Sequence, residues 1–405
     1  MSSKQQEQHM KKTGIPLGGR QSGTILLVVG IIFVAAALRA PFTSVGPLLE
    51  MIRDDLGLSN TLAGAITTLP LLAFALLSPF APQLARRFGL ANVLMLAMLT
   101  LSIGILIRSA SGTVTLFAGT AMIGLSIAVC NVLLPGLIKG KFPARIGLMT
   151  GMYTVSMNLC AAAASGISVP LAGSAGVGWR GTLALWFIIA ALATLFWIPQ
   201  MKSLNPAGDA GGARSAGKMW RSPLAWQVTL FMGLQSLLYY VLISWFSVIL
   251  GERGMSSSHA GWILSLMQLA QLPFTFFVPL WAGRMKNQRL LVIIASSLFV
   301  LGIMGIWLGS TAWMAVWAVC IGIAGGFAFG LAMMFFSLRT RNTQEASELS
   351  GMAQSVGYLL AAMGPALFGL IHDASGSWNI PLALLAAAGV MLLLAGLGAG
   401  RDKQV

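Results

Sequence analysis

The sequence predicts an all-α integral membrane protein with twelve transmembrane helices in two repeats of six. The first reason is composition. Of the 405 residues, 57% are hydrophobic and 9% are charged, and the mean hydropathy is +0.84, which excludes a soluble globular protein. The second reason is that apolar stretches of about 20 residues, long enough to cross ~30 Å of hydrocarbon, recur along the chain. They lie near residues 24–49, 60–82, 90–108, 113–138, 146–173, 180–199, 223–250, 260–282, 290–309, 312–337, 350–371 and 379–399.

The positive charges give these spans an orientation. Twenty of the 25 lysines and arginines fall in the tails and in alternate loops, on one face of the membrane. The loops of the opposite face hold four: Arg53, Arg108, Arg180 and Arg253. Because loops rich in Lys and Arg stay in the cytoplasm, we expect both termini to be cytoplasmic. The alternation also accounts for the net charge of +15 without a nucleic-acid partner.

The longest polar connection divides the chain into two halves. It covers about residues 200–222 and contains a run rich in Gly and Ala, which is typical of a flexible linker. We therefore expect a cytoplasmic tail, a six-helix bundle, a cytoplasmic linker, a second six-helix bundle and a short tail, at residues 1–22, 23–199, 200–222, 223–400 and 401–405. The first span is longer than the apolar core of a signal peptide, so we expect it to be retained.

Short motifs recur in the two halves at an offset of about 200 residues. The pairs are Thr150-Gly151-Met152 with Ser350-Gly351-Met352, Leu69-Pro70 with Leu272-Pro273, and Ile123-Gly124 with Ile321-Gly322. Gly and Pro are common in membrane helices, so each match alone is weak, but a shared offset favours an internal repeat. Two parallel six-helix repeats are the major facilitator arrangement, whose substrate site lies near the midplane between the halves.

Arg39 is the one charged residue placed well inside a predicted span. A charge near the bilayer centre costs at least about 2.5 to 3.5 kcal/mol on insertion scales, so such residues usually face a polar interior and often mark a substrate path. A structural cation held by backbone carbonyls, or one that snorkels outward, is the alternative.

Strongly hydrogen-bonding side chains avoid four of the spans. The third, sixth, ninth and twelfth spans hold Asn, Gln or Tyr at their ends alone, as expected for helices that face lipid. The remaining spans hold all four tyrosines and the interior amides. Gln235 and Tyr239 are four residues apart, as are Gln354 and Tyr358, so each pair shares a helix face. Such groups line a cavity or join helices to one another.

Several stretches resemble the cyanate and 2-nitroimidazole transporter family of the major facilitator superfamily, and its nitroimidazole branch in particular. They are residues 38–49, 67–76, 131–139, 220–231, 349–358 and 399–403, so the resemblance covers essentially the whole chain. The wider superfamily carries an Asp in the loop after the second span that takes part in a cytoplasmic gate. Here Arg86 stands in its place. We take Arg86, Arg87 and Arg284 as gating candidates.

The spans provide one positive charge and no acid. All ten carboxylates lie in loops, tails or span ends, so the buried acid that many drug/proton antiporters use is absent from the sequence. A cavity with a single arginine favours anions or groups with concentrated negative charge. The substrate-binding candidates are Arg39, Thr43, Asn131, Gln235, Tyr239, Gln268, Gln354 and Tyr358. Glu50, Asp54 and Asp55 are candidates for proton coupling, although a solvated loop is the favoured explanation for them.

We therefore expect a secondary transporter in the bacterial inner membrane that moves a small anionic or nitro-aromatic solute by alternating access. The family resemblance implies 2-nitroimidazole-like solutes and export, by antiport or otherwise. A cyanate or other small-anion carrier and a broader drug efflux pump are the alternatives. An enzyme is not expected, because no Asp, Glu or His lies inside a span to support catalysis. We expect no cofactor or bound metal, and a monomer.

Overall fold

A computed structural model describes residues 17–174, 176–201 and 219–405, which form helices joined by short loops. Most of the expected N-terminal tail and linker therefore lies outside the described residues. The helices of the first half are α2 (Leu17–Thr43), α3 (Val45–Leu56), α4 (Asn60–Leu77), α5 (Ala81–Phe88), α6 (Leu90–Ser109), α7 (Thr113–Lys141), α8 (Ile146–Ser174), α9 (Gly178–Leu185) and α10 (Phe187–Trp197). Those of the second half are α13 (Pro223–Glu252), α14 (Ser257–Arg284), α15 (Arg289–Leu308), α16 (Met314–Leu338), α17 (Thr343–Ser375) and α18 (Asn379–Ala399). Two short 3-10 turns, η1 (Pro143–Arg145) and η2 (Thr311–Trp313), complete the described elements.

Twelve spans are present when a bent pair is taken as one span. Within the described residues, eleven helices are long and apolar enough to cross a membrane. The remaining span joins residues 64–77 to α5 through a bend of 58°. The sequence Ser78-Pro79-Phe80 at this bend explains it, because proline cannot donate a backbone hydrogen bond to continue the helix.

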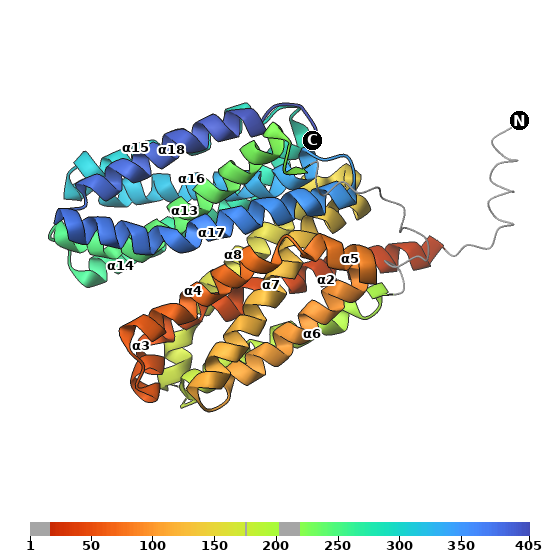
Figure 1. Ribbon diagram of the computed structural model, residues 1–405, viewed down its shortest axis with the longest axis horizontal. Coiled ribbons are helices and arrows are strands. Elements are labelled where there is room, and N and C mark those ends of the chain that lie inside the picture. Colours follow the sequence, from red (N-terminus) through yellow and green to blue (C-terminus); the bar gives the residue numbers. More distant parts are fainter. Residues whose placement is uncertain (1–16, 175, 202–218) are drawn as a thin grey trace, which may run out of the picture.

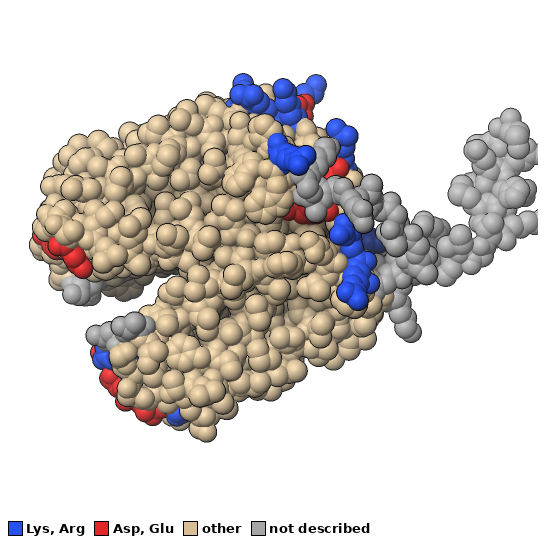
Figure 2. Space-filling model, viewed as in Figure 1, with Lys and Arg blue, Asp and Glu red and all other residues tan. Residues whose placement is uncertain are grey.

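The two halves form two groups of helices that meet at one end and separate at the other (Figure 1). In the space-filling view of the same orientation, a cleft runs inward between them from the separated end (Figure 2). Lysines and arginines gather at the end where the halves meet (Figure 2). We call this the basic end; it carries Arg86, Arg145, Arg284, Arg341 and Arg401. The opposite end, where the cleft opens, is called the open end.

The helices that the sequence assigns to lipid lie on the outside of each half. α6 packs against α7 and α10, and α15 packs against α16 and α18, all within their own halves. Large apolar side chains cover their outer faces, including Leu96 and Ile103 on α6 and Leu301 on α15, which are 65%, 49% and 56% exposed. Such a surface suits hydrocarbon and would be unfavourable in water.

The halves meet through α4, α7 and α8 of the first half and α14, α16 and α17 of the second. At the basic end, the Lys139 ammonium donates hydrogen bonds to the carbonyls of Ser337 and Thr340, where α16 ends. A cation at the C-terminal end of a helix is favourable because the last carbonyls are unpaired and the helix dipole is negative there. Lys139 therefore joins the first half to the second through backbone carbonyls.

Arg339, 200 residues after Lys139, stays within its own half. Its guanidinium donates to the side-chain carbonyl of Gln288. Burial lowers the pKa of Arg339 to about 10, and Asp402 opposes that shift, so the group remains protonated at neutral pH. The two equivalent cations thus have different partners, and one of them crosses the interface.

The repeated glycines mark close helix crossings. A Cβ added to Gly151 on α8 would lie 2.7 Å from the carbonyl oxygen of Phe276 on α14, and one added to Gly351 on α17 would lie 2.7 Å from that of Ser78 at the end of α4. Glycine is required at both places because any side chain would separate the helices. The Thr150 and Ser350 motifs therefore mark equivalent crossings between the halves.

The first span is broken, a feature that the sequence analysis did not predict. It consists of α2 and α3, which meet at Ser44. The carbonyl of Pro41, next to the break, accepts hydrogen bonds from the Ser44 hydroxyl at 3.3 Å and from Arg108 Nη1 at 2.6 Å. Arg108 ends α6, as expected for a residue of the opposite face, but its side chain turns inward and is 1% exposed. Arg108 is therefore buried, and it binds a backbone carbonyl beside the break.

Candidate functional site

A polar pocket lies between the two halves. Its lining comes from six helices: Arg39 on α2, Asn158 on α8, Gln235, Ser236, Tyr239 and Tyr240 on α13, Gln271 on α14, Gly325 and Phe329 on α16, and Tyr358 on α17. The space among these side chains, including its mouth, is about 380 Å³.

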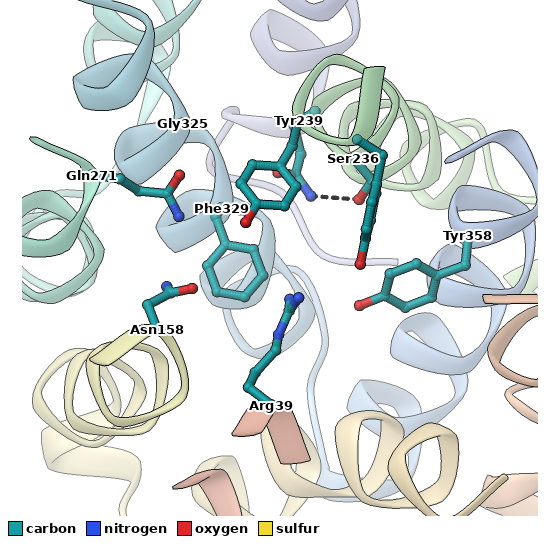
Figure 3. A pocket seen from close by; sticks show the side chains of 10 residues that line it. Arg39, Asn158, Ser236, Tyr239, Gln271, Gly325, Phe329 and Tyr358 are labelled. Carbon is teal, nitrogen blue, oxygen red and sulfur yellow. Dashed lines mark hydrogen bonds between the residues drawn. The ribbon is translucent and has the colours of Figure 1, made fainter. Parts of the chain in front are cut away.

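Arg39 is the one charged side chain among the described residues that line the pocket. Its guanidinium carbon lies 5.7 Å from the centre of the Phe329 ring, and Figure 3 shows it directed into the space between Asn158 and Tyr358. No hydrogen bond or ion pair to this guanidinium occurs within the described residues. The backbone carbonyl of Arg39 is occupied separately, by the Thr43 hydroxyl at 3.1 Å. The guanidinium donors are therefore available to a ligand.

Three tyrosines give the pocket aromatic walls with polar tips. The Tyr239 and Tyr240 rings meet edge to face at 5.3 Å, and the Tyr358 ring meets Phe74 in the same manner at 4.9 Å. Figure 3 shows the Tyr358 hydroxyl directed toward the side where the Arg39 guanidinium lies. The Tyr240 hydroxyl is buried and has no hydrogen-bond partner among the described residues. Aromatic rings beside a cation suit a planar solute that carries negative charge.

The pocket brings together four of the residues selected from the sequence: Arg39, Gln235, Tyr239 and Tyr358. Gln235 and Tyr239 share one face of α13, as their spacing indicates. The Gln235 amide donates to the Ser236 hydroxyl at 2.7 Å (Figure 3). Its orientation is thus fixed by a neighbour on the same helix.

Asn131 and Gln354 hydrogen-bond to protein groups between the helices. The Gln354 amide donates to the Asn131 backbone carbonyl at 3.0 Å and to the Ser350 hydroxyl at 2.8 Å. The Asn131 side-chain carbonyl accepts from the Tyr153 hydroxyl at 3.0 Å. These bonds join α7 to α8 within the first half and to α17 across the interface, so in this conformation both residues act between helices.

Two other substrate-binding candidates lie outside this lining. The Thr43 hydroxyl donates to the Ala161 carbonyl on α8 at 3.2 Å, which ties α2 to α8. Gln268 is half-buried on α14, one turn nearer the open end than the lining residue Gln271.

The gating candidates Arg86, Arg87 and Arg284 are exposed at the basic end. The Arg87 guanidinium lies 5.3 Å from the Phe88 ring on its own helix. Their positions fit the cytoplasmic loops expected from the sequence.

The acidic candidates lie on α3 toward the open end. Asp54 pairs with Arg53 at 2.9 Å and Asp55 pairs with Arg180 at 2.8 Å. The Glu50 side chain is 81% exposed. Their carboxylates therefore lie at the surface in ion pairs with arginines or in solvent. Within the described residues, no group of three or more His, Cys, Asp or Glu could hold a metal ion.

Sequence reasoning did not select six lining residues: Asn158, Ser236, Tyr240, Gln271, Gly325 and Phe329. Asn158, Tyr240 and Gln271 did belong to the set of polar residues in the central spans. That signal identifies the right helices, but the rotation of each helix decides which polar side chains face the cleft. Phe329 and Gly325 carry no polar signal and could not be found this way.

The fold and the pocket define a multi-spanning transport protein of two pseudo-equivalent halves with a site between them. The Major Facilitator Superfamily model matches residues 29–365, and the chain belongs to this superfamily. It is 48% identical over 380 residues to an uncharacterized transporter, YycB, of Bacillus subtilis, with 94% of each chain covered. It is 44% identical over 382 residues to the 2-nitroimidazole transporter of Escherichia coli, covering 94% of this chain and 97% of that one.

More distant similarities support the same family and the same fold. The cyanate transport protein CynX of Escherichia coli is 25% identical over 371 residues, which cover 91% of this chain and 96% of CynX. The solved structure of the Escherichia coli fucose:proton symporter matches with a TM-score of 0.73 at 12% identity, covering 92% of this chain and 98% of that one, and so supports the fold alone. The resemblance to the cyanate and 2-nitroimidazole family and the predicted fold class are thereby confirmed.

Proposed function

We propose that this protein is a secondary transporter that binds a small, planar anionic or nitro-aromatic solute at Arg39 and moves it across the bacterial inner membrane by alternating access. The single observation that carries the proposal is the Arg39 guanidinium, which faces the pocket without a protein partner. A charge in a membrane interior is costly unless it is paired, so a negatively charged group on the solute is the complementary partner. The 2-nitroimidazole transporter, which shares 44% identity, supports a nitro-aromatic solute.

Alternating access is supported by the asymmetry of the two ends. The halves are joined at the basic end by Lys139 and the close glycine crossings, while a cleft separates them at the open end (Figure 2). If the basic end is cytoplasmic, as the charge distribution indicates, this conformation opens to the outside. Rocking of the halves about the pocket would open the other side.

A cyanate or other small-anion carrier is the second candidate. It is favoured by the same unpartnered cation, and CynX at 25% identity is a cyanate transport protein. Broad efflux of cationic drugs is disfavoured, because the described residues that line the pocket include no carboxylate.

The deciding experiment is export by cells that produce or lack the protein. A deletion strain is grown on 2-nitroimidazole and separately on cyanate, with the gene restored on a plasmid or an empty plasmid. We expect the gene to raise the tolerated concentration of 2-nitroimidazole. Import of the compound would make the producing strain more sensitive instead, and protection from cyanate alone would support the second candidate.

The acidic group on α3 is expected to leave energy coupling unchanged. Neutralising all three carboxylates, by Glu50→Gln, Asp54→Asn and Asp55→Asn, removes exposed or surface-paired charges worth at most about 1 kcal/mol each. Transport in proteoliposomes with an imposed pH gradient should stay within about 2-fold of the wild type. Loss of the response to the pH gradient, with transport down a solute gradient retained, would assign the proton relay to these residues.

A further inference from the structure

Two amide side chains lie where the contact between α8 and α14 ends and the pocket begins. Nearer the basic end, the Thr154 hydroxyl on α8 donates a hydrogen bond to the Thr275 carbonyl on α14 at 2.6 Å, and both residues are fully buried. Asn158 is four residues after Thr154, and Gln271 is four residues before Thr275. Because α8 runs away from the basic end and α14 runs toward it, each amide lies one helical turn, about 5.4 Å, closer to the open end.

These amides have no protein partner in this conformation. The Asn158 side-chain nitrogen is buried and makes no hydrogen bond with any described residue. No hydrogen bond to the Gln271 amide occurs among the described residues either. The buried Asn158 nitrogen is unfavourable without a partner, so a group that enters the pocket and accepts a hydrogen bond from it gains affinity.

Gly325 lies against the Gln271 amide. A Cβ added to Gly325 would lie 3.0 Å from the Gln271 side-chain oxygen, so α16 passes close to this end of the amide. Figure 3 shows the Gln271 nitrogen turned toward the side of the pocket where Asn158 lies. The two amides therefore form one polar surface, with one residue from each half.

This amide pair is separate from the charged part of the pocket. In Figure 3, Asn158 and Gln271 lie on one side, Tyr358 lies on the other, and the Arg39 guanidinium lies between them. A solute that places its negative group on Arg39 thus presents another edge to the amides. Amides both donate and accept hydrogen bonds, so they suit a ring nitrogen or a hydroxyl and gain nothing from an apolar edge.

We propose that Asn158 and Gln271 are specificity-determining residues that bind a second polar group on the solute, on a different ring edge from the group held by Arg39. The substrate class is then a planar ring with a nitro or carboxylate group and, elsewhere on the ring, a hydrogen-bonding nitrogen or hydroxyl. This inference rests on the proposed function, because it takes Arg39 as the site of the first group. A site built to hydrogen-bond one group rejects analogues that lack it, which gives the pair its selectivity.

The test compares probes that differ in the second group alone. Full-length purified protein in nanodiscs is titrated with 2-nitroimidazole and with 2-nitrothiophene, a five-membered nitro-aromatic ring without ring nitrogens. 4-Hydroxybenzoate and benzoate form the matching carboxylate pair. In the wild type we expect the first member of at least one pair to bind about 10-fold or more tightly than the second.

The variants are Asn158→Leu and Gln271→Met, which keep side-chain size and remove the amides. Each should weaken binding of the preferred probe about 10-fold and leave its partner within about 2-fold, so the selectivity disappears. The matched control is Asn92→Leu on α6, where an exposed amide donates to the carbonyl of Phe88, the last residue of α5, at 2.9 Å. It should leave both affinities and their ratio unchanged.

The outcomes separate the two proposals. Equal binding of both members of each pair by the wild type overturns the amide site and leaves the Arg39 proposal standing. Equal losses of affinity for both probes of a pair in the variants indicate a structural role for the amides and also overturn the amide site. Absence of binding for all four probes contradicts the proposed function and this inference together.

Discussion

Replacing Arg39 with glutamine should raise the Kd for 2-nitroimidazole about 100-fold and reduce transport to background. The guanidinium is the one charged group among the described lining residues, and no protein group competes for its donors within the described chain. A hydrogen bond to a charged group contributes about 1.5 to 3 kcal/mol, which is a factor of about 10 to 150 in affinity. Glutamine keeps a donor and much of the length, so the change isolates the charge.

The Arg39→Gln protein should remain in the membrane and should unfold at or above the wild-type temperature. Because the guanidinium lacks a protein counter-charge, its removal eliminates an unpaired charge instead of breaking an ion pair. Arg39→Lys keeps the charge and loses the planar set of donors, so we expect an intermediate affinity. The measurements are titration in nanodiscs, flux in proteoliposomes and thermal unfolding of the same preparations. Wild-type affinity and flux in Arg39→Gln would show that Arg39 is a structural cation.

The sequence predicts the fold well because the fold follows from composition and position along the chain. The span lengths, the alternation of basic loops and the lack of amides in the outer helices each reflect the cost of placing polar groups in hydrocarbon. The break at Ser44 could not be predicted. The Arg108 side chain binds the Pro41 carbonyl beside the break across 67 residues of sequence, and the local sequence shows neither this partner nor the direction of the side chain.

The site is predictable to the helix and only partly to the residue. The energetic cost of placing Arg39 inside a span is enough to select it from the sequence as a candidate. Gln354 and Tyr358 share a helix face, yet Tyr358 lines the pocket while Gln354 bonds to the Asn131 carbonyl and to Ser350. Distance along the helix from the basic end decides between these roles, and that depends on where the two halves touch. The repeat motifs indicate where the two halves touch, because Gly151 and Gly351 lie at two of the close crossings between them.

Replacing Gly151 with valine should shift the protein out of the conformation described here and abolish transport. A Cβ at this position would lie 2.7 Å from the Phe276 carbonyl oxygen, a backbone atom that cannot move aside without displacing α14. Overpacking of this kind costs about 1 to 3 kcal/mol or more, and a two-state equilibrium shifts about tenfold for each 1.4 kcal/mol. Gly351→Val should act in the same way, because its Cβ would lie 2.7 Å from the Ser78 carbonyl oxygen at the equivalent crossing.

The matched control is Gly166→Val, which introduces the same side chain on α8. No atom lies within 4 Å of a Cβ built at Gly166, so valine is accommodated there in this conformation. The width of the cleft is measured between spin labels at Val114 and Leu308, which are exposed at the ends of α7 and α15 that lie toward the open end. The native Cys130, Cys160 and Cys320 are first replaced by serine so that only these two sites carry labels.

Gly151→Val and Gly351→Val should shorten the distance between these labels and increase labelling of cysteines placed at the basic end. Gly166→Val should keep the wide distance, because it leaves the crossing at the basic end intact. If alternating access is a rocking of the halves, closing the open end and opening the basic end must occur together. A Gly151→Val protein that opens at the basic end while the cleft stays wide would show that the two ends move independently. Full transport by that variant would show that the close crossing of α8 and α14 is not required in the transport cycle.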